Sequence, residues 1–513
     1  MSPVQLPPAA PAPNDSARAA AIAPALPAVD SVFRAFAERA HVPGIAYGVI
    51  VGGHLVHVGT AGLRDVAARA PVDTTTVFRI ASMTKSFTAA AILQLRDAGK
   101  LALDDPASKY VPEMRTVRGP TGDAPVITIR HLLTHSEGFP EDNAWGDRQL
   151  AVRDDELSRT LRDGVPFSTT PGTAYEYSNL GFAILGRIVA RASGMPYARY
   201  MATRVFAPLG MRHTYLEPAR VPAERRAVGH RWQDGAWALE PSLADGAYGP
   251  MGGMLTSVGD LSRWVAFLAD AWPPRDGADS PVLSRASRRE MQQLWRFSGT
   301  SAARDPMAGL AFTTGGYGYG LAVRHGVTAG MTGLCRQPLA VSHSGGLPGW
   351  GSIMRWFPES GVGVVALGNL TYTSWGAPLD SAVARIARTG ALAPRPVEPA
   401  PVLVERQREV SRLVATWDDA LADRVAAMNL FLDESRDGRR TELARLVREA
   451  GGSCRPEGAL VAENALRGRW RMRCATGDLR VAITLAPTQP ARVQVLDVRA
   501  MRPEESLDAA VCR

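Results

Sequence analysis

The chain contains very little lysine. Of its 58 basic residues only three are lysines, Lys85, Lys100 and Lys109, and arginine takes every other basic position. An arginine side chain keeps its proton under all working conditions, whereas burial or nearby positive charge can make a lysine release its proton. A side-chain amine that acts as a base can therefore come only from these three positions.

Long apolar runs and basic stripes are also missing. No apolar run approaches the roughly 18 residues that a membrane span needs, so no span is expected. The formal charge of +8 and the pI near 9.6 would permit acidic partners, but the arginines are scattered among Asp and Glu. Because no basic stripe with interleaved aromatic residues is present, nucleic acid is not expected as a partner. With 46% hydrophobic residues in 513, the chain is predicted to be globular with two or three domains.

Cysteine is scarce as well. The four cysteines are Cys335, Cys454, Cys474 and Cys512, and three of them lie in the last sixty residues. This clustering favours one disulfide near the C-terminus, with Cys454 to Cys474 as the first choice, although four cysteines allow three full pairings and four separate buried thiols would also fit. A disulfide would suit an exported protein. Residues 1–27 are rich in Pro and Ala and predict a flexible leader; a signal peptide is not evident, because no basic region followed by an apolar core is present.

The pattern along the rest of the chain predicts two domains. Residues 28–40 are typical of an amphipathic helix, and residues 41–65 of two strands joined at Gly52 and Gly53. Helix and loop patterns fill 101–270, and strand-like alternation returns between 316 and 369. Sheet sequence at both ends of a helical middle predicts an α/β domain over residues 28–392, with a sheet completed by distant segments and an inserted helical subdomain.

A Pro-rich stretch, residues 393–401, is the clearest linker, because four prolines in APRPVEPAP hold the chain extended. After it, residues 402–513 combine a helical pattern with three alternating stretches, which predicts a small α+β domain. This domain shows no catalytic grouping, so a structural or assembly role is expected. Oligomeric state cannot be predicted from the sequence.

The stretch FRIASMTKSFTAAAILQL places Ser82 and Lys85 three residues apart, ahead of a segment that is uncharged from Ser86 to Leu95. A hydroxyl at i and an amine at i+3 lie on one helical face, so a neutral amine there could accept the hydroxyl proton. The helix is apolar almost all round, which predicts burial of its lysine. Ser82 near the N-terminus of the helix would favour developing negative charge. Alone, the spacing also fits coincidence.

Two further stretches add groups of the right chemistry. In PGTAYEYSNLGF, Tyr177 could relay a proton, and the amide of Asn179 could hold both a substrate carbonyl and a lysine. In VSHSGGLPGW, His343, Ser344 and Gly345 lie on a predicted strand whose glycines let a substrate backbone approach. Each stretch is weak by itself, and the three in this order are far more specific.

With these motifs, residues 29–388 resemble the serine β-lactamase and penicillin-binding protein superfamily. The resemblance is greatest to its branch of class C β-lactamases, DD-carboxypeptidases, D-aminopeptidases and family VIII esterases. It rests on Ser82-Met83-Thr84-Lys85, Tyr177-Ser178-Asn179 and His343-Ser344-Gly345, with support from HLLTHSEG, PLGM and GGMLTSVGDL. It implies the β-lactamase/transpeptidase-like fold, an antiparallel sheet flanked by helices with an inserted helical subdomain.

The resemblance also implies roles for the motif residues. Ser82 would be the acylated nucleophile, Lys85 its base partner and Tyr177 the proton relay to the leaving group. Asn179 would bind the substrate amide, with His343, Ser344 and Gly345 on the facing strand. The oxyanion hole would be the backbone N–H groups of Ser82 and Gly346.

The third motif departs from the β-lactamases, which usually carry Lys-Thr-Gly or Lys-Ser-Gly where His343 stands. A histidine is only partly charged near neutrality, so it anchors a carboxylate less reliably than lysine. The sequence therefore predicts a serine hydrolase that acts through an acyl-enzyme on a short D-amino-acid peptide or a small ester. A β-lactamase is the alternative, and a non-catalytic penicillin-binding or sensor protein is the alternative of another class.

No metal or other cofactor is expected. His131 and His135 are four residues apart, as helical metal ligands can be, but they lack an H-E-x-x-H pattern and fall within HLLTHSEG. His54 and His57 are three apart on a strand and so face opposite sides. The expected partner is a small-molecule or short-peptide substrate.

Overall fold

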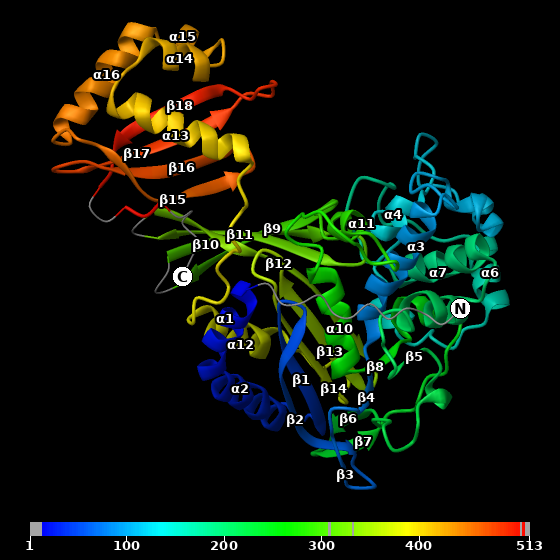
Figure 1. Ribbon diagram of the computed structural model, residues 1–513. Helices are drawn as coiled ribbons and strands as arrows, with labels where there is room; N and C mark the ends of the chain where they lie inside the picture. Colours follow the sequence, from blue (N-terminus) through cyan, green and yellow to red (C-terminus); the bar gives the residue numbers. More distant parts are fainter. Residues whose placement is uncertain (1–12, 306–308, 331–332, 503–504, 508–513) are drawn as a thin grey trace. The chain divides into compact units, whose positions relative to one another are not determined.

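The computed structural model describes residues 13–305, 309–330, 333–502 and 505–507 (Figure 1). The chain divides into two compact units, the first ending at Ala393 and the second beginning at Pro394. The division falls within the Pro-rich stretch 393–401, and helix α13 (Pro401–Ala415) begins where that stretch ends.

The first unit is built on a nine-stranded antiparallel sheet with the order β3-β2-β1-β14-β13-β12-β11-β10-β9. Three strands come from the start of the unit: β1 (Gly44–Val51), β2 (His54–Asp65) and β3 (Ala70–Pro71). Six come from its end: β9 (Arg296–Asp305), β10 (Gly309–Tyr317), β11 (Ala322–Gly330), β12 (Gly333–Leu347), β13 (Trp350–Phe357) and β14 (Val362–Gly368). The antiparallel β1–β14 pairing joins the two groups, which confirms the predicted sheet completed by distant segments.

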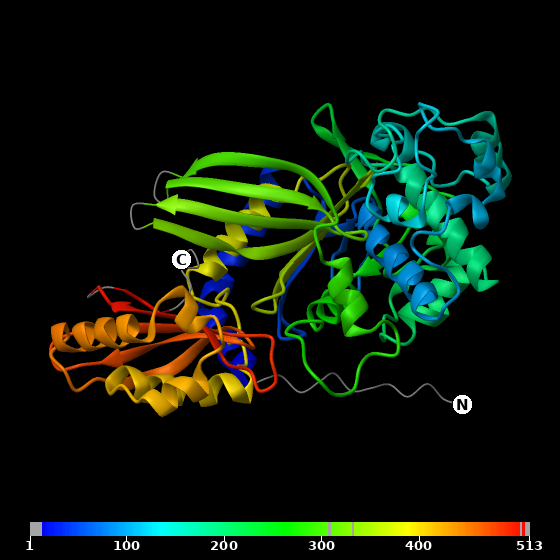
Figure 2. The same cartoon turned by 90° about the horizontal axis from the view of Figure 1, so that it is seen from above.

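Helices cover both faces of the centre of this sheet. Every residue of β1 and β14 is buried, because α2 (Leu26–Arg39) and α12 (Gly376–Ala387) pack on one face and α10 (Val258–Ala269) packs on the other (Figure 1). On the first face, the Phe33 ring stacks on the Tyr47 ring with centroids 4.5 Å apart. The four strands β9 to β12 lie side by side at one end of the sheet (green in Figure 2).

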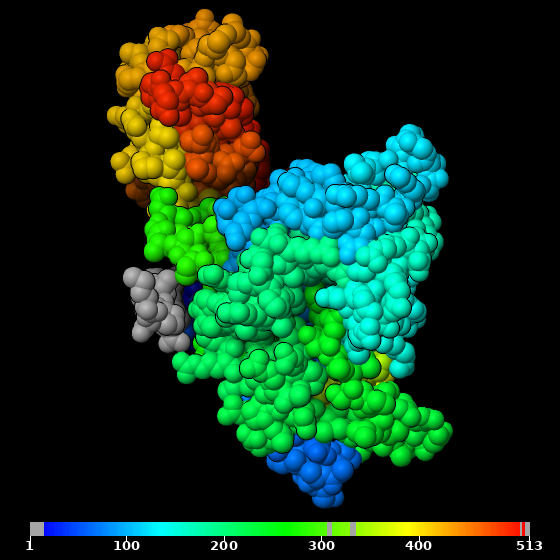
Figure 3. Space-filling view, turned by 90° about the vertical axis from the view of Figure 1, so that its right-hand side faces the viewer, coloured from blue at the N-terminus to red at the C-terminus, as the bar shows by residue number. Residues whose placement is uncertain are grey.

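The helical subdomain is inserted between β3 and β9. Its main helices are α3 (Thr84–Asp97) and α7 (Asn179–Ser193), and eleven of the fourteen residues of α3 are buried, as its apolar sequence predicts. The shorter helices are α4 (Ile129–Leu133), α5 (Asn143–Gly146), α6 (Asp154–Asp163), α8 (Tyr197–Met201), α9 (Gly249–Gly252) and α11 (Arg285–Met291). A small sheet, β4 (Val77–Arg79), β8 (Leu255–Ser257) and β5 (Thr214–Tyr215), and a hairpin, β6 (His230–Gln233) with β7 (Ala236–Leu239), complete the insert. In Figure 3 the insert, in cyan to green, forms most of the visible face of this unit.

The second unit is a small α+β structure. Four helices, α13, α14 (Asp419–Val425), α15 (Leu430–Asp433) and α16 (Arg436–Glu449), precede a four-stranded antiparallel sheet. The strands lie in chain order: β15 (Arg455–Asn464), β16 (Arg467–Arg473), β17 (Asp478–Leu485) and β18 (Val493–Ala500). Alternate residues of β16 and β17 are buried, so one face of the sheet, with Trp470 and Met472, builds the core.

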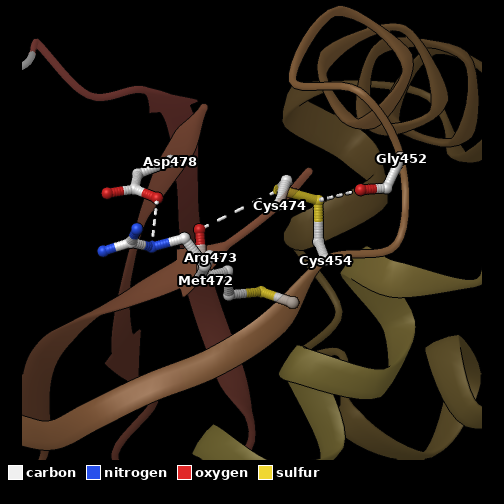
Figure 4. The surroundings of a disulfide bond; sticks show 6 residues. All are labelled: Gly452, Cys454, Met472, Arg473, Cys474 and Asp478. Atoms are coloured by element: carbon white, nitrogen blue, oxygen red, sulfur yellow. Dashed lines mark hydrogen bonds and ion pairs between the residues drawn. A yellow bond between two sulfur atoms is a disulfide. The ribbon is translucent and has the colours of Figure 1, made fainter. Parts of the chain in front are cut away.

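A disulfide joins Cys454 to Cys474, as the first-choice pairing predicts. Cys454 lies between α16 and β15, and Cys474 follows β16 (Figure 4). Both cysteines are buried in the core of the second unit. Cys335 is disulfide-bonded as well, which leaves no free thiol in the described part of the chain. Cys512 lies outside the described residues.

The N-terminal segment differs from the prediction of a flexible leader. Residues 1–12 lie outside the described part, but α1 (Pro13–Ile22) and a 3-10 turn (Ala23–Ala25) continue directly into α2. Alanine has the highest helix propensity, and the run is anchored by Ile22, which is fully buried, and by Arg18, whose guanidinium donates to the Ala391 and Ala393 carbonyl oxygens. Composition alone therefore misjudged residues 13–27.

The same run bears on the expectation of no membrane span, which stays a prediction. The helical stretch Asp15–Arg39 has 25 residues and is long and apolar enough to cross a membrane by length and composition alone. Its scattered charged residues break up any continuous apolar stretch. A signal sequence or the core helix of a globular protein passes the same test, and in this structure Val29, Phe33 and Ala37 of the stretch are buried.

Candidate active site

Ser82 lies on a tight turn where strand β4 meets helix α3. The turn, Ala81–Met83, is a 3-10 segment, and Ala81 has a left-handed φ of 48°. Such a φ costs an alanine about 1–2 kcal/mol, so the surroundings must hold the turn in place. They do so through Ile80, whose carbonyl accepts a hydrogen bond from Ser352 Oγ at 2.8 Å and whose N–H donates to the Met254 carbonyl at 2.9 Å. The serine is thereby fixed at the N-terminal end of the helix.

Lys85 is one turn further along and is fully buried. Its Nζ lies 3.1 Å from Ser82 Oγ, 2.6 Å from Asn179 Oδ1 and 2.9 Å from the Met251 carbonyl oxygen. Burial lowers the pKa of Lys85 from 10.5 to about 7, against the opposing effect of the carboxylates of Asp147 and Asp142. A neutral Lys85 amine has a lone pair that can accept the Ser82 proton, so the predicted pairing of these two residues has the geometry that base catalysis needs.

Tyr177 stands beside this pair at the entrance to α7. Lys85 Nζ is 4.8 Å from the centroid of the Tyr177 ring. Burial raises the pKa of Tyr177 well above its ordinary value, and a hydrogen bond to Ser82 partly opposes this. The phenol therefore keeps its proton at neutral pH, which suits a proton donor better than a base.

Asn179 is the first residue of α7 and has no exposed surface. Its Oδ1 accepts from Lys85 Nζ, and its Nδ2 donates to Asn143 Oδ1 at 3.1 Å. Both ends of the amide are thus engaged by protein groups. The predicted contact with the lysine is present, and binding of a substrate amide by Asn179 stays a prediction.

His343 lies on β12 and is a neutral imidazole. Its Nδ1 is 2.6 Å from the Ser344 carbonyl oxygen, which can only accept, so Nδ1 carries the proton. Nε2 then accepts from the Tyr317 hydroxyl at 2.8 Å. Burial and the nearby Lys85 lower the pKa of His343 from 6.5 to about 3. The partial charge expected from the sequence is therefore absent at neutral pH.

The glycines after His343 allow the strand to approach the turn that carries Ser82. A Cβ atom at Gly345 would lie 2.1 Å from the Ile80 carbonyl oxygen and 3.0 Å from Ala81 Cβ. Only glycine permits this contact, which brings β12 against the turn that holds Ser82. Gly346 follows and lies under the Tyr372 ring, since a Cβ there would be 2.8 Å from Tyr372 Cδ1.

These elements border a cleft of about 580 Å³. Predicted residues in its lining are Tyr177, His343, Ser344, Gly345 and Gly346, and further lining residues include Tyr175, Tyr317, Arg324, Arg355 and Tyr372. Ser82, Lys85 and Asn179 are not among the lining residues. Ser82 is 8% exposed and lies within hydrogen-bonding reach of Tyr177, which does line the cleft. The fold therefore brings the three sequence motifs together at one place.

Three of the four histidines in these pairs have hydrogen-bond partners among the described residues. His131 Nδ1 accepts from the Thr128 N–H as part of a helix cap, and His135 Nδ1 accepts from the Ser178 N–H at 3.1 Å. His57 Nε2 is 2.7 Å from Asp30 Oδ1. Within the described ranges, no group of three His, Cys, Asp or Glu side chains is placed to hold a metal ion. A metal-free site stays a prediction.

Similarity to known proteins identifies the family of this chain. The Beta-lactamase family model matches residues 29–389, most of the first unit. The chain belongs to the beta-lactamase family. The esterase EstB of Burkholderia gladioli is 30% identical over 381 residues, which cover 69% of this chain and 93% of the esterase. The protein flp of Staphylococcus aureus strain COL is 29% identical over 241 residues. The matched region covers 48% of flp, so this chain spans about half the length of that relative.

A solved structure supports the fold. The octameric penicillin-binding protein homologue from Pyrococcus abyssi superimposes with a TM-score of 0.52, covering 93% of this chain and 95% of the homologue at 22% identity. At this identity the likeness concerns the fold alone. Together with the family match, it confirms the predicted β-lactamase/transpeptidase-like fold.

The importance of the contact between β12 and the turn that carries Ser82 can be tested with Gly345→Ala. We expect the added methyl group to displace Ile80 or β12 and to slow the acylation of Ser82 at least a hundredfold, because a shift of about 1 Å at reacting groups has an effect of this size. The measurement is the rate of labelling by a fluorophosphonate probe. Gly259→Ala, on α10, is the control, because a Cβ there would meet only Ser257 Oγ at 3.9 Å, and it should label at the wild-type rate. Normal labelling of Gly345→Ala would show that the close approach is not needed.

Proposed function

We propose that this protein is a serine hydrolase that forms an acyl-enzyme on Ser82. The observation that carries the proposal is the buried Lys85 amine, 3.1 Å from Ser82 Oγ, in surroundings that lower its pKa to about 7. At that value a large share of the amine is neutral near physiological pH and can act as a base. Membership of the beta-lactamase family supports the same reading.

The acylation step follows from the positions of the groups. Lys85 takes the proton of Ser82 while Ser82 Oγ attacks the carbonyl carbon of the substrate and forms the new C–O bond. The backbone N–H groups of Ser82 and Gly346 stabilise the oxyanion of the tetrahedral intermediate. Tyr177, which holds its proton firmly, donates it to the leaving group as the scissile bond breaks, and the proton on Lys85 restores the phenol.

Deacylation uses the same groups in the reverse sense. A water molecule loses a proton to the Lys85 and Tyr177 pair and attacks the acyl carbonyl. The bond to Ser82 Oγ breaks, and Ser82 regains a proton while the acid product leaves. Each proton that a side chain accepts in one step is released in a later step, so Ser82, Lys85 and Tyr177 end the cycle as they began it. This cycle uses no cofactor.

Among substrates we favour a small ester or a short D-amino-acid peptide over a β-lactam. The neutral imidazole of His343 offers no charge to a substrate carboxylate, whereas the β-lactamases usually carry a lysine there. The esterase EstB, 30% identical, supports an ester. Arg324 lines the cleft and offers a guanidinium to a substrate carboxylate, so it supports the peptide over the ester but does not separate the peptide from a β-lactam.

A non-catalytic binding or sensor protein is the rival from another class. The contacts of Ser82 support an enzyme instead, because Lys85 Nζ lies 3.1 Å from Ser82 Oγ and Tyr177 hydrogen-bonds to Ser82, an arrangement that binding alone does not require. Stoichiometric acylation without turnover would support the rival.

Export of the protein also remains a proposal. The Cys454–Cys474 disulfide and the disulfide-bonded Cys335 support it, because disulfides persist in oxidising compartments.

The nucleophile is tested by labelling. A fluorophosphonate probe should add one adduct to the wild-type protein, on the peptide that contains Ser82, and Ser82→Ala should remove the adduct completely. Ser86→Ala is the matched control, since Ser86 lies on the same helix but its Oγ donates to the Met83 carbonyl at 2.8 Å; its adduct should persist. An adduct that survives in Ser82→Ala would overturn the assignment.

The substrate class is tested with a panel at several pH values. The panel contains p-nitrophenyl butyrate, a D-aminoacyl anilide, a D-Ala-D-Ala peptide and nitrocefin, with Ser82→Ala as the blank. We expect kcat/KM for the ester or for one of the D-amino-acid substrates to exceed that for nitrocefin at least tenfold, which corresponds to about 1.4 kcal/mol. Faster turnover of nitrocefin than of all the others would reverse the ranking.

A further inference from the structure

The short segment Asp142–Asp147, which includes helix α5, lies directly against Asn179. Both carboxylate oxygens of Asp142 accept from the start of α7: Oδ1 from the Asn179 N–H at 2.6 Å and Oδ2 from the Leu180 N–H at 2.9 Å. An acid that accepts the free N–H groups of a helix start also interacts favourably with the helix dipole. Asp142 therefore fixes the backbone of the residue that holds Lys85.

Asn143 and Gly146 fix the side chain of the same residue. Asn143 Oδ1 accepts from Asn179 Nδ2 at 3.1 Å, which leaves Asn179 Oδ1 facing Lys85 Nζ at 2.6 Å. A Cβ at Gly146 would lie 2.9 Å from Asn179 Cβ, so the glycine allows α5 to pack this closely. The orientation of the amide toward the lysine is thus set from outside α7.

Asp147 ends the segment as a buried acid. Its side chain accepts from the Tyr372 hydroxyl through Oδ2 at 3.1 Å, while Oδ1 is buried and has no hydrogen-bond partner among the described residues. The negative charge of Asp147 raises the pKa of Lys85 against the effect of burial. Burial in turn raises the pKa of Asp147 to about 6, and Lys85 opposes this rise.

We propose that the segment is a positioning device for Lys85: Asp142 and Asn143 hold Asn179 in its contact with the Lys85 amine, and Asp147 adds a buried carboxyl group to the surroundings of the site. The inference rests on the proposed function, because it matters only if Lys85 is the base. The other ionisable groups that face Lys85 from its surroundings are His135, His343 and Tyr177, and those that face Asp147 are Asp142, Glu141 and Tyr372. His135 and His343 have pKa values shifted well below the neutral range and Tyr177 well above it, so none of these three changes charge near pH 7.

The test is the pH dependence of fluorophosphonate labelling of the full chain. In the wild type the rate should rise as pH rises through about 7, because only neutral Lys85 accepts the Ser82 proton. Asp147→Asn keeps the shape and an acceptor for Tyr372 but removes the charge, so cationic Lys85 loses a stabilising partner and becomes neutral at lower pH. We expect the acid limb of the profile to move down by about one pH unit. Asp142→Asn should move it in the same direction and serves as the second variant if Asp147→Asn fails to fold.

Asp163→Asn is the matched control, because it neutralises an exposed carboxylate at the end of α6 that is not among the groups acting on Lys85, Asp142 or Asp147. It should leave the acid limb in place. The inference would be overturned if both Asp147→Asn and Asp142→Asn slowed labelling but left the acid limb of the pH profile at its wild-type position. A merely structural role would lower the labelling rate equally at all pH values. If the wild type forms no adduct at Ser82, the proposed function fails instead, so the two failures can be told apart.

Discussion

The active-site arrangement depends on the burial of one amine. Lys85 is fully enclosed, yet its Nζ has three oxygen atoms within hydrogen-bonding distance, from Ser82, Asn179 and the Met251 carbonyl. An isolated buried ammonium would be costly, and the site lowers that cost in two ways: the amine can become neutral, and two carboxylates stand nearby when it does not. Burial and the two carboxylates together place the pKa of Lys85 near neutral pH, where a neutral amine can act as a base.

The residues around Lys85 come from different regions of the fold. The turn before α3 presents Ser82, α7 presents Asn179, and strand β12 approaches the turn closely because Gly345 has no side chain. Ser352 of β13 donates to the Ile80 carbonyl and so connects the sheet to the turn that carries Ser82. The site therefore lies where the sheet and its helical insert meet, and its precision depends on both.

Much of the site could be predicted from the sequence, because its central pair is local. Ser82 and Lys85 are three residues apart on one helix, and the scarcity of lysine marks them as unusual. Tyr177, His343 and Gly345 could be placed in the site only through motif order and family resemblance. The charge state of His343 could not be predicted, because it depends on the Ser344 carbonyl and the Tyr317 hydroxyl, which the fold brings to its two nitrogens.

The Asp142–Asp147 segment could not be predicted at all, because in the sequence it is typical of a polar surface loop. The role of Asp147 becomes visible only when the fold buries it beside Tyr372 and near Lys85. The N-terminal helix shows a different error. Its Pro- and Ala-rich composition suggests a flexible segment, but buried contacts hold the segment as a helix. In each case long-range packing decided what local composition could not.

The scarcity of lysine also makes the central claim directly measurable. Selective ¹⁵N labelling of lysine side chains should give three NMR signals, from Lys85, Lys100 and Lys109, and Lys85→Arg assigns the first by its loss. The account predicts that the Lys85 signal titrates near pH 7, while Lys109, whose pKa is raised by its bond to Asp105, keeps its proton throughout. A Lys85 signal that titrates only near the ordinary lysine value of about 10.4 would contradict the account.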